Sequence, residues 1–198
     1  ALRNLFTRID RHIVNKSVRT VFTSEGFANY HFGDKWPEKI CIIPNKLKKE
    51  VIEYPGLEKQ TDISHLQFAF VGSFRFQSVY NFAKVVLSNF PNHTFHFFGA
   101  ASGKENEELF NTLKAYNNCV FHGRFKNPVD LPSVYSQIDL LLSTYDVQYI
   151  NVKFAEPNKL YEAIYYDTPI IVSSNCFLGD KVEKMGVGYA LDALNDDE

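Results

Sequence analysis

The residues best suited to chemistry gather at the predicted start of a helix. Residues 156–163 read EPNKLYEA, and Pro157 and Asn158 are typical of a helix start, where free backbone amides carry partial positive charge. Lys159 adds a cation, which the helix dipole disfavours at this position unless an anion is present. Glu162 adds a carboxylate that can accept two hydrogen bonds from a vicinal diol such as ribose. This group of residues suits the binding of a phosphate.

Two of these side chains also have a purely structural explanation. Lys159 could extend into water at little cost, and Glu162 favours helix formation simply because it lies in the first turn. The residue types alone leave both readings open.

A second set of candidates follows apolar runs farther upstream. Gly72 ends one such run and Arg75 comes three residues later, so the backbone can approach a ligand while a guanidinium offers donors to phosphate oxygens. The alternative is a tight turn with a solvated Arg. His122 and Gly123 follow another run, where they either border a base pocket or are ordinary residues at a strand end. The polar loop 145–153 either closes over a ligand or only connects two elements.

These candidates are separated by segments that alternate between strand and helix patterns. No two-residue hairpin turns occur between the apolar runs, which predicts a Rossmann-like α/β layer: a parallel sheet with helices on both faces. Gly72, Gly99, Gly123 and Ser143 then fall at the carboxyl ends of strands, where open α/β sheets bind ligands. We predict strands at 66–71, 93–98, 120–121, 139–143 and 169–173, and helices at 77–89, 105–117, 132–137 and from 157.

The first 65 residues show a different organisation. Their pattern predicts a helix at 2–15, a strand at 19–23 followed by Ser24 as a helix cap, a helix at 25–32 and a strand at 40–43. The charged segment 46–65 carries Pro55-Gly56 and is expected to be a linker or exposed crossing. The chain begins without Met inside a predicted helix, so we expect it to be cut from a larger protein. The expected domains are 1–45, 46–65 and 66–198.

Composition excludes several classes of protein. The chain has 198 residues, 45% apolar and 22% charged, and a formal net charge of −2, which gives no reason to expect nucleic acid or an anionic membrane as the main partner. No apolar run is long enough to span a bilayer and no signal peptide is recognisable, so a cytoplasmic location is expected. Zinc-ligand spacing, a nucleophile elbow and a phosphate-binding P-loop are all absent from the sequence.

Taken together, the motifs resemble the donor-binding half of retaining GT-B glycosyltransferases over about residues 66–192. Upstream, VFTSE at 21–25 and IIPN at 42–45 resemble the last elements of the acceptor-binding half, so residues 1–45 would be a remnant of that half. The motifs that carry the resemblance are FVGSFR (70–75), FHFFG (95–99), VFHG (120–123), DLLLS (139–143), PNKLYEA (157–163) and TPIIVS (168–173).

The resemblance implies a nucleotide-sugar donor and a glycan or lipid-linked acceptor in bacterial polysaccharide or glycoconjugate synthesis. No cofactor, metal or nucleic acid is implied, and the fragment alone is expected to bind donor weakly and to transfer nothing. Peripheral membrane association would occur through the missing half. The implied catalytic residues are Arg75 and Lys159. The implied donor-binding residues are Gly72, Ser73, His122, Gly123, Asn158, Leu160 and Glu162, with the nucleoside near His122 and Gly123 and the ribose on Glu162.

Two positions depart from the family pattern. The first of two Glu that the family often carries corresponds to Phe154, so contacts to the sugar must differ or come from Glu156 or Asn151. A Lys that many members carry corresponds to Tyr80, and Lys159 is the candidate for the missing positive charge. Two other hypotheses stay open: a GT-B nucleotide-sugar epimerase, and a flavodoxin-like interaction domain without a ligand.

Overall fold

The computed structural model describes residues 2–192, 194 and 195, and its centre is a six-stranded parallel sheet. The strands lie in the order β5-β4-β3-β6-β7-β8, and every neighbouring pair is parallel. This arrangement confirms the predicted Rossmann-like layer. The strands are β3 (Gln67–Phe74), β4 (Thr94–Ala101), β5 (Cys119–Gly123), β6 (Leu140–Ser143), β7 (Ile170–Ser173) and β8 (Gly188–Leu191).

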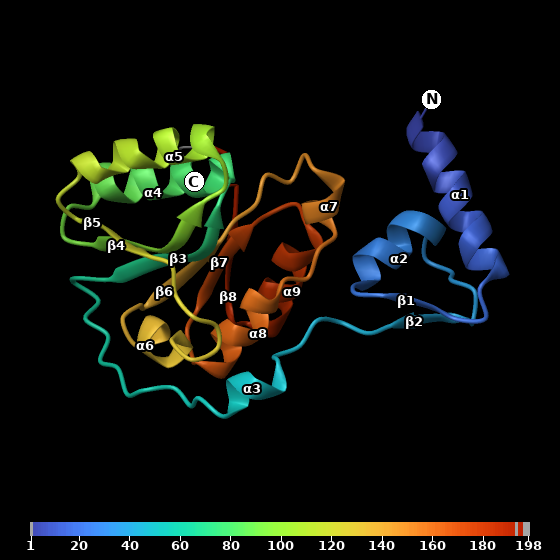
Figure 1. Cartoon of the computed structure of the whole chain (residues 1–198), viewed down its shortest axis with the longest axis horizontal. Coiled ribbons are helices and arrows are strands. Elements are labelled where there is room, and N and C mark those ends of the chain that lie inside the picture. The colour runs from blue at the N-terminus through green and yellow to red at the C-terminus, as the bar shows by residue number, and fades with distance from the viewer. Residues whose placement is uncertain (1, 193, 196–198) are drawn as a thin grey trace.

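Helices cover both faces of this sheet (Figure 1). One face packs against α4 (Gln77–Asn89) and α5 (Lys104–Asn111) through an aromatic core that includes Phe70, Phe97 and Phe110. The opposite face packs against α6 (Leu131–Tyr135), α8 (Asn158–Tyr165) and α9 (Phe177–Met185). Successive strand residues point to opposite faces, so the apolar runs of β3 and β4 supply both cores.

The strands β3 and β4 continue three residues beyond their predicted ends. Gly72 and Gly99, expected at the ends, face each other within the pair, and the pairing runs on to Phe74 and Ala101. Both glycines have positive φ, +138° and +135°. A Cβ on Gly99 would lie 1.9 Å from the carbonyl oxygen of Gly72. The strands can therefore pair past this point only because Gly99 has no side chain.

Four helices and one strand differ from the predicted elements, either in their bounds or because the prediction did not include them. The expected helix at 105–117 ends at Asn111 and continues as a 3₁₀ turn, η1 (Thr112–Ala115). Two short helices lie inside segments that were expected to be loops, and α9 with β8 completes the sheet beyond the last predicted strand. The short helices are α3 (Lys49–Ile52) and α7 (Ile150–Lys153).

Residues before 45 form a separate small layer beside the main sheet (Figure 1). It follows the predicted order: α1 (Leu2–Lys16), β1 (Thr20–Phe22), α2 (Glu25–Phe32) and β2 (Ile40–Ile42). The strands β1 and β2 are parallel, and the predicted cap Ser24 accepts a hydrogen bond from the Phe27 amide (3.2 Å). Several contacts join this layer to the loop before the helix at 158–165: Ser24 Oγ donates to the Phe154 carbonyl, the rings of Phe27 and Tyr30 pack against Phe154, and Asn45 Nδ2, just after the layer, donates to the Glu156 carbonyl (2.7 Å).

The crossing segment 46–65 is mostly exposed, as expected, but a few of its residues anchor it to the main layer. Val51 of α3 is 2% exposed and belongs to the core of the α8 face. The Tyr166 hydroxyl donates to the Tyr54 carbonyl (3.0 Å), and Lys59 Nζ donates to Thr168 Oγ1 (2.9 Å). The segment is therefore fastened along the ends of α6 and α8.

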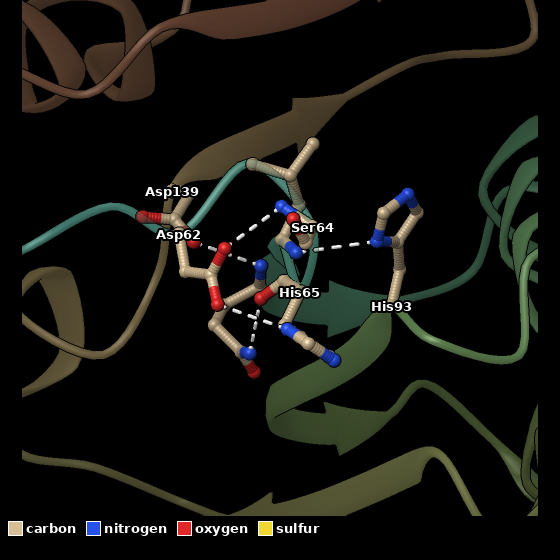
Figure 2. Close-up of polar contacts among 7 residues, drawn as sticks. Asp62, Ser64, His65, His93 and Asp139 are labelled. Carbon is tan, nitrogen blue, oxygen red and sulfur yellow. Dashed lines mark hydrogen bonds and ion pairs between the residues drawn. The ribbon is translucent and has the colours of Figure 1, made fainter.

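Polar side chains hold the entry into β3 at the amino-terminal edge of the sheet (Figure 2). Asp139 accepts from the Gln67 amide (2.9 Å), Asp62 accepts from the Ser64 amide (2.9 Å), and the Leu66 amide donates to His93 Nδ1 (3.2 Å). These contacts fix the start of the central strand. Within the described part of the chain, every helix is too short or too polar to cross a lipid bilayer.

Candidate functional site

The candidate site lies at the carboxyl edge of the sheet, between β3 and β6. From β3 the strand order runs through β4 to β5 in one direction and through β6 to β8 in the other. In open α/β sheets, such a reversal leaves a crevice at the strand ends in which ligands bind. The helices α4 and α8 both begin at this edge, because each follows a parallel strand through a loop.

Lys159, on the first turn of α8, lies directly beside Gly72 of β3. A Cβ on Gly72 would be 2.9 Å from Lys159 Nζ, and the ammonium is 5.5 Å from the centroid of the Phe70 ring. The two motifs, far apart in the sequence, therefore meet in space. Lys159 is half-buried against the sheet, so the alternative of a lysine extended into water does not apply.

The start of α8 is open, whereas the start of α4 is occupied. No side chain caps α8, and among the described residues the amides of Asn158 and Lys159 have no hydrogen-bond partner. The Leu160 amide bonds the Pro157 carbonyl (3.3 Å). At α4, by contrast, the buried Asp146 carboxylate accepts from the amides of Gln77 (3.1 Å) and Ser78 (2.9 Å). Of these two helix starts, α8 is the one that can receive an anion from outside.

A pocket of about 380 Å³ adjoins this point at the ends of β3 and β4. Small residues form much of its wall, so backbone groups are accessible to a ligand. Gly123, with φ +76°, ends β5 immediately before two of the lining residues. The pocket is lined by Gly72, Ser73, Gly99, Ala100, Ala101, Ser102, Arg124 and Phe125.

His122 is exposed and packs along the β4–β5 edge rather than standing alone. Its ring stacks on Phe98 at 4.0 Å between centroids, and its Nε2 lies 2.8 Å from Nδ1 of His96. His96 Nε2 lies 2.8 Å from Gln67 Oε1. Partial burial lowers the pKa of His122. For His96, burial and repulsion from His122 together lower the pKa to about 4. The pair is therefore neutral at pH 7 and offers aromatic surface rather than charge.

Glu162 lies one turn beyond Lys159 and is 9% exposed. Its Oε2 accepts a hydrogen bond from the hydroxyl of Tyr135 on α6 (3.2 Å). Burial raises the pKa of Tyr135 well above its usual range, with the nearby Glu162 charge adding to the shift. Tyr135 is therefore a donor to this carboxylate at any physiological pH.

The other predicted site residues have fewer contacts with the candidate site. Arg75 is exposed after β3, with its guanidinium 4.9 Å from the Phe76 ring centroid, and it does not line the pocket. Asn158 is exposed at the first position of α8, and the Leu160 side chain is fully buried, so Leu160 can meet a ligand only through its backbone. Tyr80, at the position of the missing Lys, bonds Thr112 (3.1 Å) and brings no charge.

The residues considered for sugar contacts have structural partners. Glu156 is 3% exposed, and its carboxylate is paired with Lys181 Nζ and bonded to the Tyr161 hydroxyl. Phe154 packs against the ring of Tyr30 on α2 (5.1 Å). Asn151 is exposed on α7. Of the two residues named for this role, Glu156 is thus committed to a buried ion pair.

Sequence reasoning missed two residues that organise the site, Asp146 and Tyr135. Asp146 belongs to the polar loop that the sequence singled out, but its partners on α4 are up to 69 positions away. Tyr135 is 27 positions from Glu162 and reads as an ordinary core residue of a short helix. Nothing in their local pattern identifies either partner. Within the described residues, no cluster of three or more His, Cys, Asp or Glu could hold a metal ion.

Comparisons with known proteins find similarity in structure and not in sequence. No family model matches the chain, and no curated protein matches it significantly. HepE from Anabaena, solved with UDP and glucose, superposes with a TM-score of 0.67 at 14% identity, over 97% of this chain and 54% of HepE. The HepE complex with UDP gives 0.70 at 13% identity, over 94% and 53%.

Two further glycosyltransferase structures give the same result. WaaG, a glycosyltransferase involved in lipopolysaccharide biosynthesis, has a TM-score of 0.63 at 17% identity, over 89% of this chain and 50% of WaaG. A TarM variant from S. aureus, solved with UDP among its ligands, has 0.62 at 16% identity, over 93% and 36%. The chain thus has the fold of one half of a GT-B glycosyltransferase and spans about half the length of HepE and WaaG.

Proposed function

We propose that this chain binds the nucleotide part of a nucleotide-sugar donor and forms the donor-binding half of a glycosyltransferase. The observation that carries the proposal is the uncapped start of α8, whose Lys159 ammonium lies beside Gly72 at the point where the strand order reverses. A diphosphate placed here would meet a cation and two unpaired amides at a positively polarised helix end. The UDP complexes of HepE and TarM support a nucleotide of this kind.

The adjoining groups suit the rest of such a donor. The 380 Å³ pocket at the ends of β3 and β4 is available to the nucleoside, and His122 and Gly123 directly precede two of its lining residues, Arg124 and Phe125. Glu162 would accept hydrogen bonds from the ribose diol. Lys159 and the amides of α8 would stabilise the negative charge that develops on the departing diphosphate. This chain then contributes charge and positioning, and no nucleophile is required of it.

We extend the proposal to the finer features that the resemblance implied. They are hexosyl transfer with retention of configuration, no requirement for a metal ion, and a cytoplasmic role in bacterial polysaccharide or glycoconjugate synthesis. Residues 1–45 would belong to the acceptor-binding half. The β1–β2 pair supports this assignment, because two parallel strands alone do not bury a sheet on both faces. Contact with a glycan or lipid-linked acceptor, and with a membrane, would involve that other half.

Calorimetric titration with UDP tests the phosphate site. We expect Lys159→Ala to weaken UDP binding about tenfold or more, because a charge-assisted contact is lost. Binding of uridine, which lacks phosphates, should change little. Lys84→Ala is the matched control, since Lys84 is an exposed lysine on α4. Equal UDP affinity in the wild type and Lys159→Ala would contradict the assignment of Lys159.

The two other hypotheses predict different results in related experiments. A flavodoxin-like interaction domain without a ligand should show no thermal stabilisation with any uridine or guanosine diphosphate. A nucleotide-sugar epimerase should convert its donor without an acceptor in assays of the full-length protein, whereas a glycosyltransferase should form product only when the acceptor is supplied.

A further inference from the structure

The carboxylate of Glu162 is held from one side by a single neutral donor. Glu162 is 9% exposed, and Tyr135 bonds its Oε2 at 3.2 Å. Among the residues that the structure describes, no other group donates a hydrogen bond to this side chain. A carboxylate has room for about four hydrogen bonds on its two oxygens. The remaining acceptor positions on the carboxylate are therefore available to a ligand.

Tyr135 itself has no freedom to move. It is 1% exposed, and its ring stacks on Tyr166 at 4.6 Å between centroids with the planes 18° apart. Leu131, Val134 and Ile138 from the same segment pack into the same core. The position of its hydroxyl is therefore set by side-chain packing, and its hydrogen bond favours the orientation of the carboxylate seen here.

Glu162 and Lys159 lie three positions apart on one helix, so they occupy the same side of α8. Lys159 reaches the edge of β3 at Gly72, and Glu162 faces Tyr135 on α6. A ligand whose phosphates lie at the start of α8 would therefore bring its ribose past the carboxylate that Tyr135 holds. A fixed carboxylate binds a diol more tightly than a mobile one, because the loss of side-chain freedom has already occurred on folding.

We propose that Tyr135 is a positioning residue, which orients Glu162 for bidentate hydrogen bonding to the vicinal hydroxyls of a ribose. This inference rests on the proposed nucleotide-binding function and adds a residue that touches no ligand. The preference for a nucleotide with both ribose hydroxyls over a nucleotide that lacks them would then depend on the hydroxyl of Tyr135, which is buried in the core.

The experiment compares UDP with 2′,3′-dideoxyuridine diphosphate, which lacks both ribose hydroxyls, by calorimetric titration of the full 198-residue chain. The wild type should prefer UDP. Tyr135→Phe should weaken UDP binding about tenfold, the effect of losing one hydrogen bond to a charged group, and should leave the affinity for the dideoxy compound unchanged. In a Glu162→Ala background, Tyr135→Phe should have no further effect on UDP.

Tyr166→Phe is the matched control, because it removes a hydroxyl from the same stacked pair. That hydroxyl donates to the Tyr54 carbonyl and not to Glu162, so this variant should keep the wild-type preference for UDP. An unchanged ratio of the two affinities in Tyr135→Phe, or an equal loss in Tyr166→Phe, would overturn the inference while the nucleotide site stands. Absence of UDP binding by the wild type would overturn the proposed function as well.

Discussion

At the scale of single residues, Gly99 meets the strictest steric limit at the site. Its φ of +135° and the 1.9 Å from a built Cβ to the Gly72 carbonyl oxygen leave no room for a side chain. We expect Gly99→Ala to lower the free energy of unfolding by about 3 kcal/mol or more, from backbone strain and overpacking together. Urea denaturation at 25 °C measures the change.

Gly103→Ala separates the two causes of that loss. Gly103 also has positive φ, +87°, but a Cβ there would meet nothing within 4 Å. Its replacement should cost only the strain, about 1–2 kcal/mol. Similar losses in the two variants would show that the approach of β4 to the Gly72 carbonyl is not limiting.

His96 makes the stability of the fold depend on pH. Burial, with repulsion from His122, lowers its pKa from 6.5 to about 4, partly offset by attraction to Asp139. Between these values the unfolded chain binds a proton that the folded chain does not. We therefore expect this contribution to stability to be present above pH 6.5 and to be lost as the pH falls towards 4.

Urea denaturation at pH 7.5, 6 and 5 checks this prediction. His96→Gln should flatten the decline in the free energy of unfolding over this range, because glutamine does not titrate. His12→Gln is the control, since His12 is exposed on α1 and its replacement should leave the decline as in the wild type. A decline of the same steepness in His96→Gln would rule out His96 as its source.

Residue types pointed to the charged and flexible groups of the candidate site. Gly72 and Lys159 are informative because each is unusual at its place in a strand or helix, and Glu162 because it follows Lys159 by one turn. The partners that fix them could not be inferred, since Tyr135 and Asp146 look like an ordinary core tyrosine and an ordinary loop aspartate. Their roles depend on which helices face each other, and no local pattern records that.

At the scale of elements, apolar periodicity identified the strands and long helices of the sheet, and it failed where elements are short. The helices α3 and α7 have four residues each, too few for a periodic pattern to develop. The strand ends were also misjudged, because glycine was read as a stop. In β3 and β4 it instead permits the close pairing that extends both strands.

The same scale explains why the two helix starts at the site differ. Asp146 supplies to α4 the anion that α8 lacks. The loop after β6 thus fills one positively polarised helix end and leaves the next one open. This difference between the two helix starts, and not the number of basic residues, therefore decides where an anion can bind.

At the scale of the whole molecule, the small layer is attached to the loop before α8 through two hydrogen bonds and the packing of Phe27 and Tyr30 on Phe154. The hydrogen bond from Asn45 to the Glu156 carbonyl spans 111 positions in the sequence. We expect Asn45→Ala to loosen this attachment at a cost of about 1 kcal/mol and to raise hydrogen exchange in α2. Amide exchange followed by mass spectrometry would measure the effect.

Asn106→Ala provides the control for that measurement. Asn106 Nδ2 donates to the Ser102 carbonyl at the same 2.7 Å, but within the region of α5. Its replacement should leave exchange in α2 unaltered. If α2 exchanged equally fast in Asn45→Ala and the wild type, the contact would not hold the layer in place.

The parallel arrangement of the main sheet also aligns the dipoles of the helices that follow its strands. Helices that follow parallel strands begin at one edge, so their dipoles point the same way, while the chain as a whole carries a formal charge of −2. A small anion that reaches this edge is attracted locally by the aligned helix starts, although the net charge of the chain has the same sign. The attraction is thus set by the direction of the strands and is confined to one edge of the molecule.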